Sequence, residues 1–196
     1  MTTIRVLKQP WSTLIAERAA RGHPPLFFIL QKAILGDATH SDTTYRVISV
    51  LFGAASLVVL YLYLSCHVKT LQTWLVMLPF LASCSQLLVV QMARSYALYQ
   101  FLVLSSLYLM TCGNRNKISP HIALFLLASL ATLTHSSSLL TLSTLVATVV
   151  LCYPQRWTLA VATTAGFVPY MSFSSFFRDQ AKFSEHTALA PPLETI

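Results

Sequence analysis

The spacing of charged residues constrains this chain more than any other feature of its sequence. Uncharged runs cover residues 47–68, 70–93, 95–114, 118–155 and 157–177. A helix that crosses a bilayer core about 30 Å thick needs about 20 mostly apolar residues. Four of the runs suit one such helix each, and the run 118–155 is long enough for two.

The polar stretch 134–138 interrupts the longest run and provides a turn between two helices. The composition agrees with membrane helices, because only 10% of the residues are charged, against about 25% in a soluble domain. We therefore predict an all-α integral membrane protein with six transmembrane helices. Their expected ranges are 45–66, 71–91, 95–112, 118–134, 136–153 and 157–177.

A large soluble helical protein is one alternative, and a small transporter is another. Helices of soluble proteins keep a polar stripe at helical spacing, whereas residues 47–66 and 74–90 have none. Proton and ion pathways use acidic residues inside the membrane, but all six carboxylates of this chain lie outside the predicted spans. Both alternatives are therefore disfavoured.

The first 44 residues are predicted to lie outside the membrane-spanning bundle. Residues 11–20 form a short amphipathic pattern, and the apolar residues 26–35 follow Pro24 and Pro25, which suit the first turn of a helix. Both segments are too short to cross a bilayer, so we expect interfacial helices. The predicted regions are a juxtamembrane segment (1–44), a six-helix bundle (45–177) and a tail (178–196).

Six crossings place both termini on the same side of the membrane. The loops of the opposite side contain Lys69, Arg115, Lys117 and Arg156, whereas the turns between helices on the terminal side contain only Arg94. By the positive-inside rule, the side with four cations faces the cytoplasm. Both termini are therefore predicted to be extracytoplasmic, although the N-terminal segment carries further cations on that side.

Distinctive polar residues gather on the terminal side in this topology, namely His23, Arg94, Tyr96 and His135. An arginine guanidinium can hold a phosphate through two parallel hydrogen bonds. The alternative for Arg94 is an interfacial arginine that extends toward lipid headgroups. The alternative for His135 is a turn residue with local hydrogen bonds.

Other kinds of site are not indicated by the sequence. It contains neither a metal-ligand cluster nor a phosphate-binding glycine loop. The four cysteines, Cys66, Cys84, Cys112 and Cys152, lack C-x-x-C spacing. We therefore expect no metal ion, no cofactor and no nucleic-acid partner.

Several short strings resemble one enzyme family in their order and spacing. They are QPW at 9–11, GHPPLFF at 22–28, GD at 36–37, RVIS at 46–49, QMARSYAL at 91–98 and LTH at 133–135. Together they cover most of residues 8–140. The set resembles polyprenyl-phosphate-dependent glycosyltransferases of the GT-C class, in particular the branch of protein O-mannosyltransferases and bacterial aminoarabinose transferases.

The resemblance implies a membrane enzyme that takes a sugar from a lipid-linked phosphate donor on the extracytoplasmic side. It places Arg94, Tyr96, His135 and His23 at the donor phosphate, where cationic groups offset the charge of the departing phosphate. In this family an aspartate of the first extracytoplasmic loop acts as general base on the acceptor hydroxyl.

The family's Asp-Glu pair belongs just upstream of residues 2–7, where this sequence begins. We therefore expect a partial glycosyltransferase-like module that binds membrane lipid and a polyprenyl-phosphate sugar donor, with the catalytic aspartate missing from this chain. Such a chain is not expected to transfer sugar by itself. The alternative is a non-catalytic membrane subunit that binds lipid or a partner protein.

Overall fold

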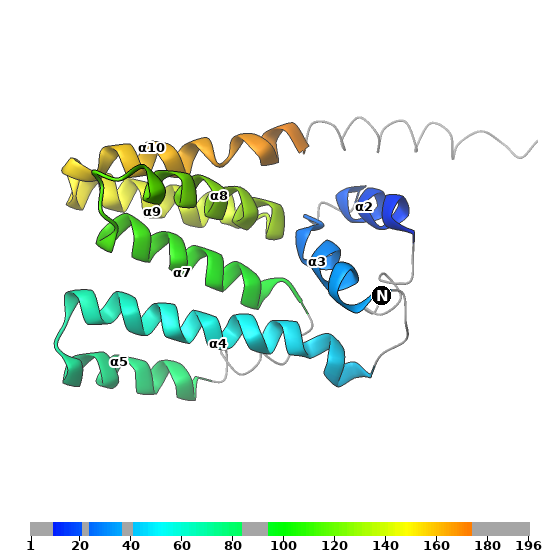
Figure 1. The fold of residues 1–196 in the computed structure, drawn as a ribbon, viewed down its shortest axis with the longest axis horizontal. Helices are drawn as coiled ribbons and strands as arrows, with labels where there is room; N and C mark the ends of the chain where they lie inside the picture. Colours follow the sequence, from blue (N-terminus) through cyan, green and yellow to red (C-terminus); the bar gives the residue numbers. More distant parts are fainter. Residues whose placement is uncertain (1–9, 21–23, 37–40, 84–93, 174–196) are drawn as a thin grey trace, which may run out of the picture.

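The computed structural model describes residues 10–20, 24–36, 41–83 and 94–173, and all regular structure in these ranges is helical. The all-α prediction is therefore confirmed. The elements (Figure 1) are α2 (Trp11–Ala20), α3 (Leu26–Leu35), α4 (Asp42–His67), α5 (Thr70–Ala82), α7 (Tyr96–Cys112), α8 (Ile118–Thr134), α9 (Ser138–Cys152), the 3-10 turn η1 (Pro154–Arg156) and α10 (Trp157–Ala165).

Most helix boundaries lie within three residues of the prediction, and α2, α3 and α8 match it. Helix α4 begins at Asp42 rather than at residue 45, because Ser41 caps it. The hydroxyl of Ser41 accepts a hydrogen bond from the backbone N–H of Thr44 at 3.3 Å, which satisfies a donor that the first helical turn leaves unpaired.

The predicted spans 71–91 and 157–177 are described only in part. Helix α5 is described to Ala82, and α10 ends at Ala165, turns at residues 166–167 and continues as helix to residue 173. The predicted tail 178–196 lies outside the described residues.

One described helix is long and apolar enough to cross a membrane, and it covers the 25 residues Thr43–His67. The remaining apolar helices of at least ten residues, among those described, contain 10–17 residues. Length and composition therefore give one candidate span, and the arrangement with six spans stays a prediction.

Helices α4 and α7 run side by side in the same direction. Near their N-terminal ends, Ser49 Oγ donates a hydrogen bond to the carbonyl oxygen of Arg94 at 3.4 Å. Near their C-terminal ends, Cys112 Sγ lies 4.0 Å from His67 Nδ1. Helix α5 doubles back along α4 in Figure 1, so the chain reverses direction before α7 begins.

The bundle consequently has two ends of different composition. We call one the His135 end, where the turn between α8 and α9 lies close to α3 and to the start of α7. We call the other the Arg156 end, where α7 ends and η1 leads into α10. Arg156 Nη1 donates to the carbonyl oxygens of Met110 and Gly113 at 3.1 and 2.9 Å, and these groups at the end of α7 would otherwise lack partners.

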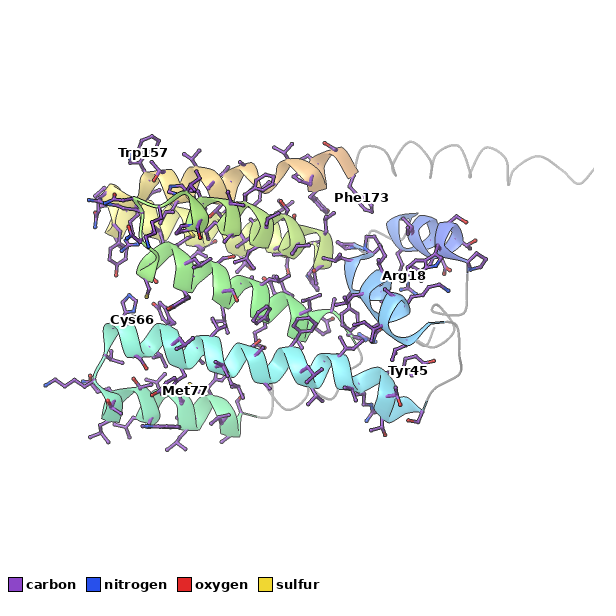
Figure 2. All side chains as sticks on the ribbon, in the orientation of Figure 1. Arg18, Tyr45, Cys66, Met77, Trp157 and Phe173 are labelled. Atoms are coloured by element: carbon purple, nitrogen blue, oxygen red, sulfur yellow. The ribbon has the colours of Figure 1, made fainter. Side chains whose placement is uncertain are left out.

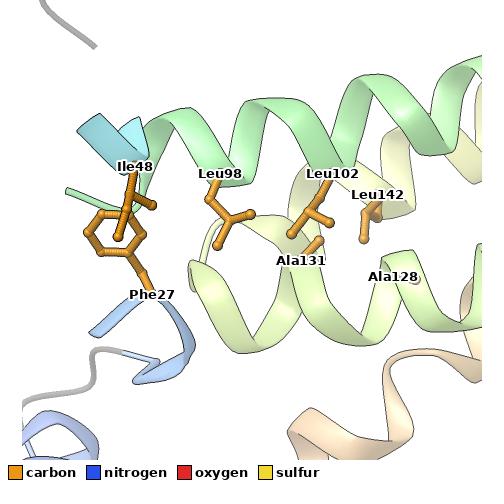
Figure 3. Packing of buried hydrophobic residues seen from close by; sticks show 7 residues of the cluster. All are labelled: Phe27, Ile48, Leu98, Leu102, Ala128, Ala131 and Leu142. Carbon is orange, nitrogen blue, oxygen red and sulfur yellow. The ribbon is translucent and has the colours of Figure 1, made fainter. Parts of the chain in front are cut away.

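An apolar cluster connects α3 to the bundle at the His135 end (Figure 3). Phe27 of α3 packs with Ile48 of α4 and Leu98 of α7, and the cluster continues through Leu102 to Ala131 of α8. Phe27 and Ala131 are completely buried. This packing holds the short N-terminal helices against the end of the bundle where the candidate site lies.

Candidate functional site

The ring of His135 packs against two tyrosines at the start of α7. Its centroid lies 5.4 Å from that of Tyr96 and 5.3 Å from that of Tyr99, with interplanar angles of 42° and 31°. Residues three apart share one face of a helix, so both tyrosines reach the turn between α8 and α9. The structure therefore brings two of the predicted site residues, Tyr96 and His135, into contact.

Helix α9 also takes part in this cluster. Tyr99 Oη donates a hydrogen bond of 2.6 Å to Thr141 Oγ1, which fixes the tyrosine ring beside His135. Neither Tyr99 nor Thr141 is among the residues predicted from the sequence. Helical spacing from Tyr96 could have indicated Tyr99, whereas Thr141 depends on how α9 packs against α7.

The hydrogen bonds of His135 determine which ring nitrogen carries the proton. Nδ1 accepts the backbone N–H of Ser137 at 3.2 Å and lies 2.7 Å from the hydroxyl oxygen of Ser137. A backbone N–H can only donate, so Nδ1 must be unprotonated. In the neutral ring the proton is therefore on Nε2, which makes Nε2–H a hydrogen-bond donor. His135 therefore makes the local hydrogen bonds of a turn residue, and it also contacts the two tyrosines.

Arg94 lies at the same end of the molecule, two residues before Tyr96. Its carbonyl oxygen is held by Ser49, and the residue is exposed. The backbone at the start of α7 is therefore anchored to α4. His23, the fourth predicted residue, lies outside the described residues.

The groups at this end are mainly hydrogen-bond donors. They comprise a guanidinium (Arg94), a phenol hydroxyl (Tyr96) and the Nε2–H of a neutral imidazole (His135), whereas the hydroxyl proton of Tyr99 is donated to Thr141. Such a set suits an anionic group that is rich in oxygen atoms. Within the described ranges, no three His, Cys, Asp or Glu residues are grouped so that they could hold a metal ion.

No protein-family model, curated protein or solved structure matches the chain.

Proposed function

We propose that this chain is a multi-pass membrane module that binds a polyprenyl-phosphate-linked sugar donor at the His135 end. The single observation that carries the donor-binding part is the contact of Tyr96 and Tyr99 with His135, next to the exposed Arg94. The resemblance to GT-C glycosyltransferases supports the class of ligand.

The distribution of apolar side chains supports a membrane environment. Large apolar residues are exposed on helices across the bundle, for example Leu140 (75% exposed) and Leu151 (82%) on α9 and Leu71 (72%) on α5. A soluble bundle buries such side chains and presents a polar face to water. Apolar residues on the outer surface of a helical bundle are what lipid chains would contact.

Small polar residues are buried in the same bundle. The hydroxyls of Ser106, Thr132 and Thr163 donate to the carbonyl oxygen four residues earlier in their own helices, at 2.8, 3.0 and 3.0 Å. All three residues are fully buried. Small residues that allow close packing are typical of interfaces between transmembrane helices.

The candidate span Thr43–His67 also has neighbours that run beside it. Contacts between α4 and α7 extend from Ser49 and Arg94 at one end to His67 and Cys112 at the other. A membrane crossed by α4 would therefore enclose α7 as well. The 17 residues of α7 rise by about 26 Å, close to the thickness of a bilayer core of about 30 Å.

The topology can be tested with single cysteines in a chain whose own cysteines are replaced by serine. Ser137→Cys lies at the His135 end and Asn116→Cys lies in the loop after α7 at the opposite end, and both positions are exposed. An impermeant thiol reagent added outside intact cells should label the first and not the second. Labelling of both positions from one side would refute the multi-pass arrangement, and the reverse pattern would refute its orientation.

Donor binding can be measured with the purified chain in lipid nanodiscs and a radiolabelled polyprenyl-phosphate sugar. Arg94→Gln should weaken binding by about 10- to 100-fold, because hydrogen bonds to a charged group contribute about 1.5–3 kcal/mol and 1.4 kcal/mol is tenfold. Tyr96→Phe, which removes one hydroxyl, should weaken it less.

The matched control is Lys117→Gln, which removes an exposed cation at the Arg156 end. Its affinity for the donor should stay within about twofold of the parent. Equal losses for Arg94→Gln and Lys117→Gln would show attraction by net charge alone and would contradict a site at the His135 end. The readout is binding, so its result does not depend on whether the chain transfers sugar.

A further inference from the structure

The N-terminal helices contain a second polar cluster, which the donor site does not use. Gln31 of α3 is completely buried, and its Nε2 donates to the carbonyl oxygen of Tyr45 at 3.0 Å. A carbonyl oxygen only accepts hydrogen bonds, so this contact fixes the orientation of the amide. Gln31 Oε1 is buried and has no hydrogen-bond partner in the described part of the chain. A buried acceptor of this kind requires an O–H or N–H group beside it.

Two cations are buried in the layer formed by α2 and α3, which also contains Gln31. Lys32 follows Gln31 and is 3% exposed, and Arg18 of α2 is 9% exposed. The guanidinium carbon of Arg18 lies 4.4 Å from the ring centroid of Phe28, and Lys32 Nζ lies 5.4 Å from that of Trp11. Guanidinium and ammonium groups are the side chains that hold phosphate in proteins.

The cluster lies where α2, α3 and the start of α4 meet. Leu14 of α2 packs with Tyr45 of α4, and Figure 2 shows Arg18 and Tyr45 at the opposite end of the molecule from Cys66. Trp11 is 45% exposed, as expected for an aromatic residue at the level of lipid headgroups. A ligand that reaches this layer from a membrane would present its headgroup first.

We propose that this layer binds the headgroup of an anionic phospholipid that carries a free hydroxyl, such as phosphatidylglycerol. The phosphate lies near Lys32 and Arg18, and a headgroup hydroxyl donates to Gln31 Oε1. The inference rests on the membrane placement in the proposed function, and it is independent of the sugar donor.

The chain offers its own reporter for this site. Trp11 lies against Lys32, and Trp74→Phe with Trp157→Phe would leave it as the only tryptophan. Lipids with brominated chains quench tryptophan fluorescence, so competition among them in nanodiscs gives relative affinities. The probes are phosphatidylglycerol, phosphatidylcholine and phosphatidylmethanol, the last of which is anionic but has no headgroup hydroxyl.

On the unsubstituted site, phosphatidylglycerol should bind about tenfold more tightly than phosphatidylcholine, with phosphatidylmethanol between them. Equal affinity for phosphatidylglycerol and phosphatidylmethanol would overturn the role of the hydroxyl. Equal affinity for all three would overturn the site, and would mean that water satisfies Gln31. Displacement of phosphatidylglycerol by soluble glycerol phosphate at equal concentration would overturn the assignment to a lipid.

Substitutions separate the two parts of the site. Gln31→Met keeps the volume of the side chain and should not change the affinity for phosphatidylmethanol. It should lower the affinity for phosphatidylglycerol to the same value. Lys32→Met should weaken both anionic lipids. Two control variants should preserve the order of affinities for the three lipids. Lys117→Gln removes the same charge elsewhere, and Arg94→Gln changes the donor site. A parent chain that shows this order of lipids but does not bind the sugar donor would refute the donor site alone.

Discussion

Gly166 determines how closely α10 approaches α8. A Cβ at this position would lie 2.6 Å from Ala128 Cβ, 2.7 Å from the carbonyl oxygen of Phe125 and 3.1 Å from the backbone nitrogen of Ser129. Carbon atoms in ordinary contact are about 3.5–4.0 Å apart. Two of the three neighbours are backbone atoms of α8, so no side-chain rotation relieves the clash. Gly166→Ala must therefore separate the two helices, and overpacking of this kind costs about 1–3 kcal/mol.

Thermal unfolding of the purified chain in detergent, followed by the loss of helical circular dichroism, measures this effect. A loss of about 1–3 kcal/mol in the free energy of unfolding should lower Tm by about 2–12 °C for a chain of this size. The control is Ala165→Leu, a larger change at an adjacent exposed position, which should alter stability by less than about 0.5 kcal/mol. An unchanged Tm for Gly166→Ala would refute the close packing of α8 and α10.

Three further outcomes can be measured by the same unfolding assay. Arg156→Gln should cost about 2 kcal/mol, because two carbonyl oxygens at the end of α7 lose a charged donor. Leu124→Ala, at a completely buried position, should cost about 2–5 kcal/mol, whereas Leu140→Ala, at a position 75% exposed, should leave Tm nearly unchanged. Tyr99→Phe and Thr141→Val should each cost about 0.5–1.5 kcal/mol, and their joint effect should be less than the sum because they remove the same hydrogen bond.

Helix positions could be predicted from the sequence because charged and proline residues mark the ends of the apolar runs. Helix α8 starts directly after Lys117, and α3 starts directly after Pro25. The turn at residues 166–167 was not predicted, since it interrupts an uncharged run. There the backbone N–H of Gly166 donates to the carbonyl oxygens of both Ala162 and Thr163, at 3.3 and 3.1 Å, so the last helical turn tightens.

The candidate site could be predicted only in part. Alternation of helix direction was sufficient to place Arg94, Tyr96 and His135 at one end, because each adjoins a helix terminus on the same side. It was not sufficient to find Thr141, whose contact with Tyr99 depends on the packing of α9. The unpaired Gln31 Oε1 depends likewise on which groups surround α3 in three dimensions, and a single polar residue in an apolar stretch does not reveal that.

The two ends of α7 explain why Arg94 is a better candidate for ligand binding than Arg156. A cation near a helix C-terminus interacts favourably with the helix dipole and with unpaired carbonyl groups, and Arg156 donates to Met110 and Gly113 there. Arg94 precedes the N-terminus of α7, where the helix dipole favours anions and opposes cations. An anion bound at this position would be attracted both by the guanidinium and by the helix.

This contrast predicts opposite consequences for one substitution at each end. Arg156→Gln should lower Tm and leave donor binding unchanged, because it removes hydrogen bonds that hold the fold. Arg94→Gln should leave Tm unchanged or slightly raised, because it removes a cation from the unfavourable end of the dipole, and it should weaken binding of the phosphate donor. A variant Arg94→Gln that unfolds several degrees below the parent would assign Arg94 a structural role and would remove it from the proposed site.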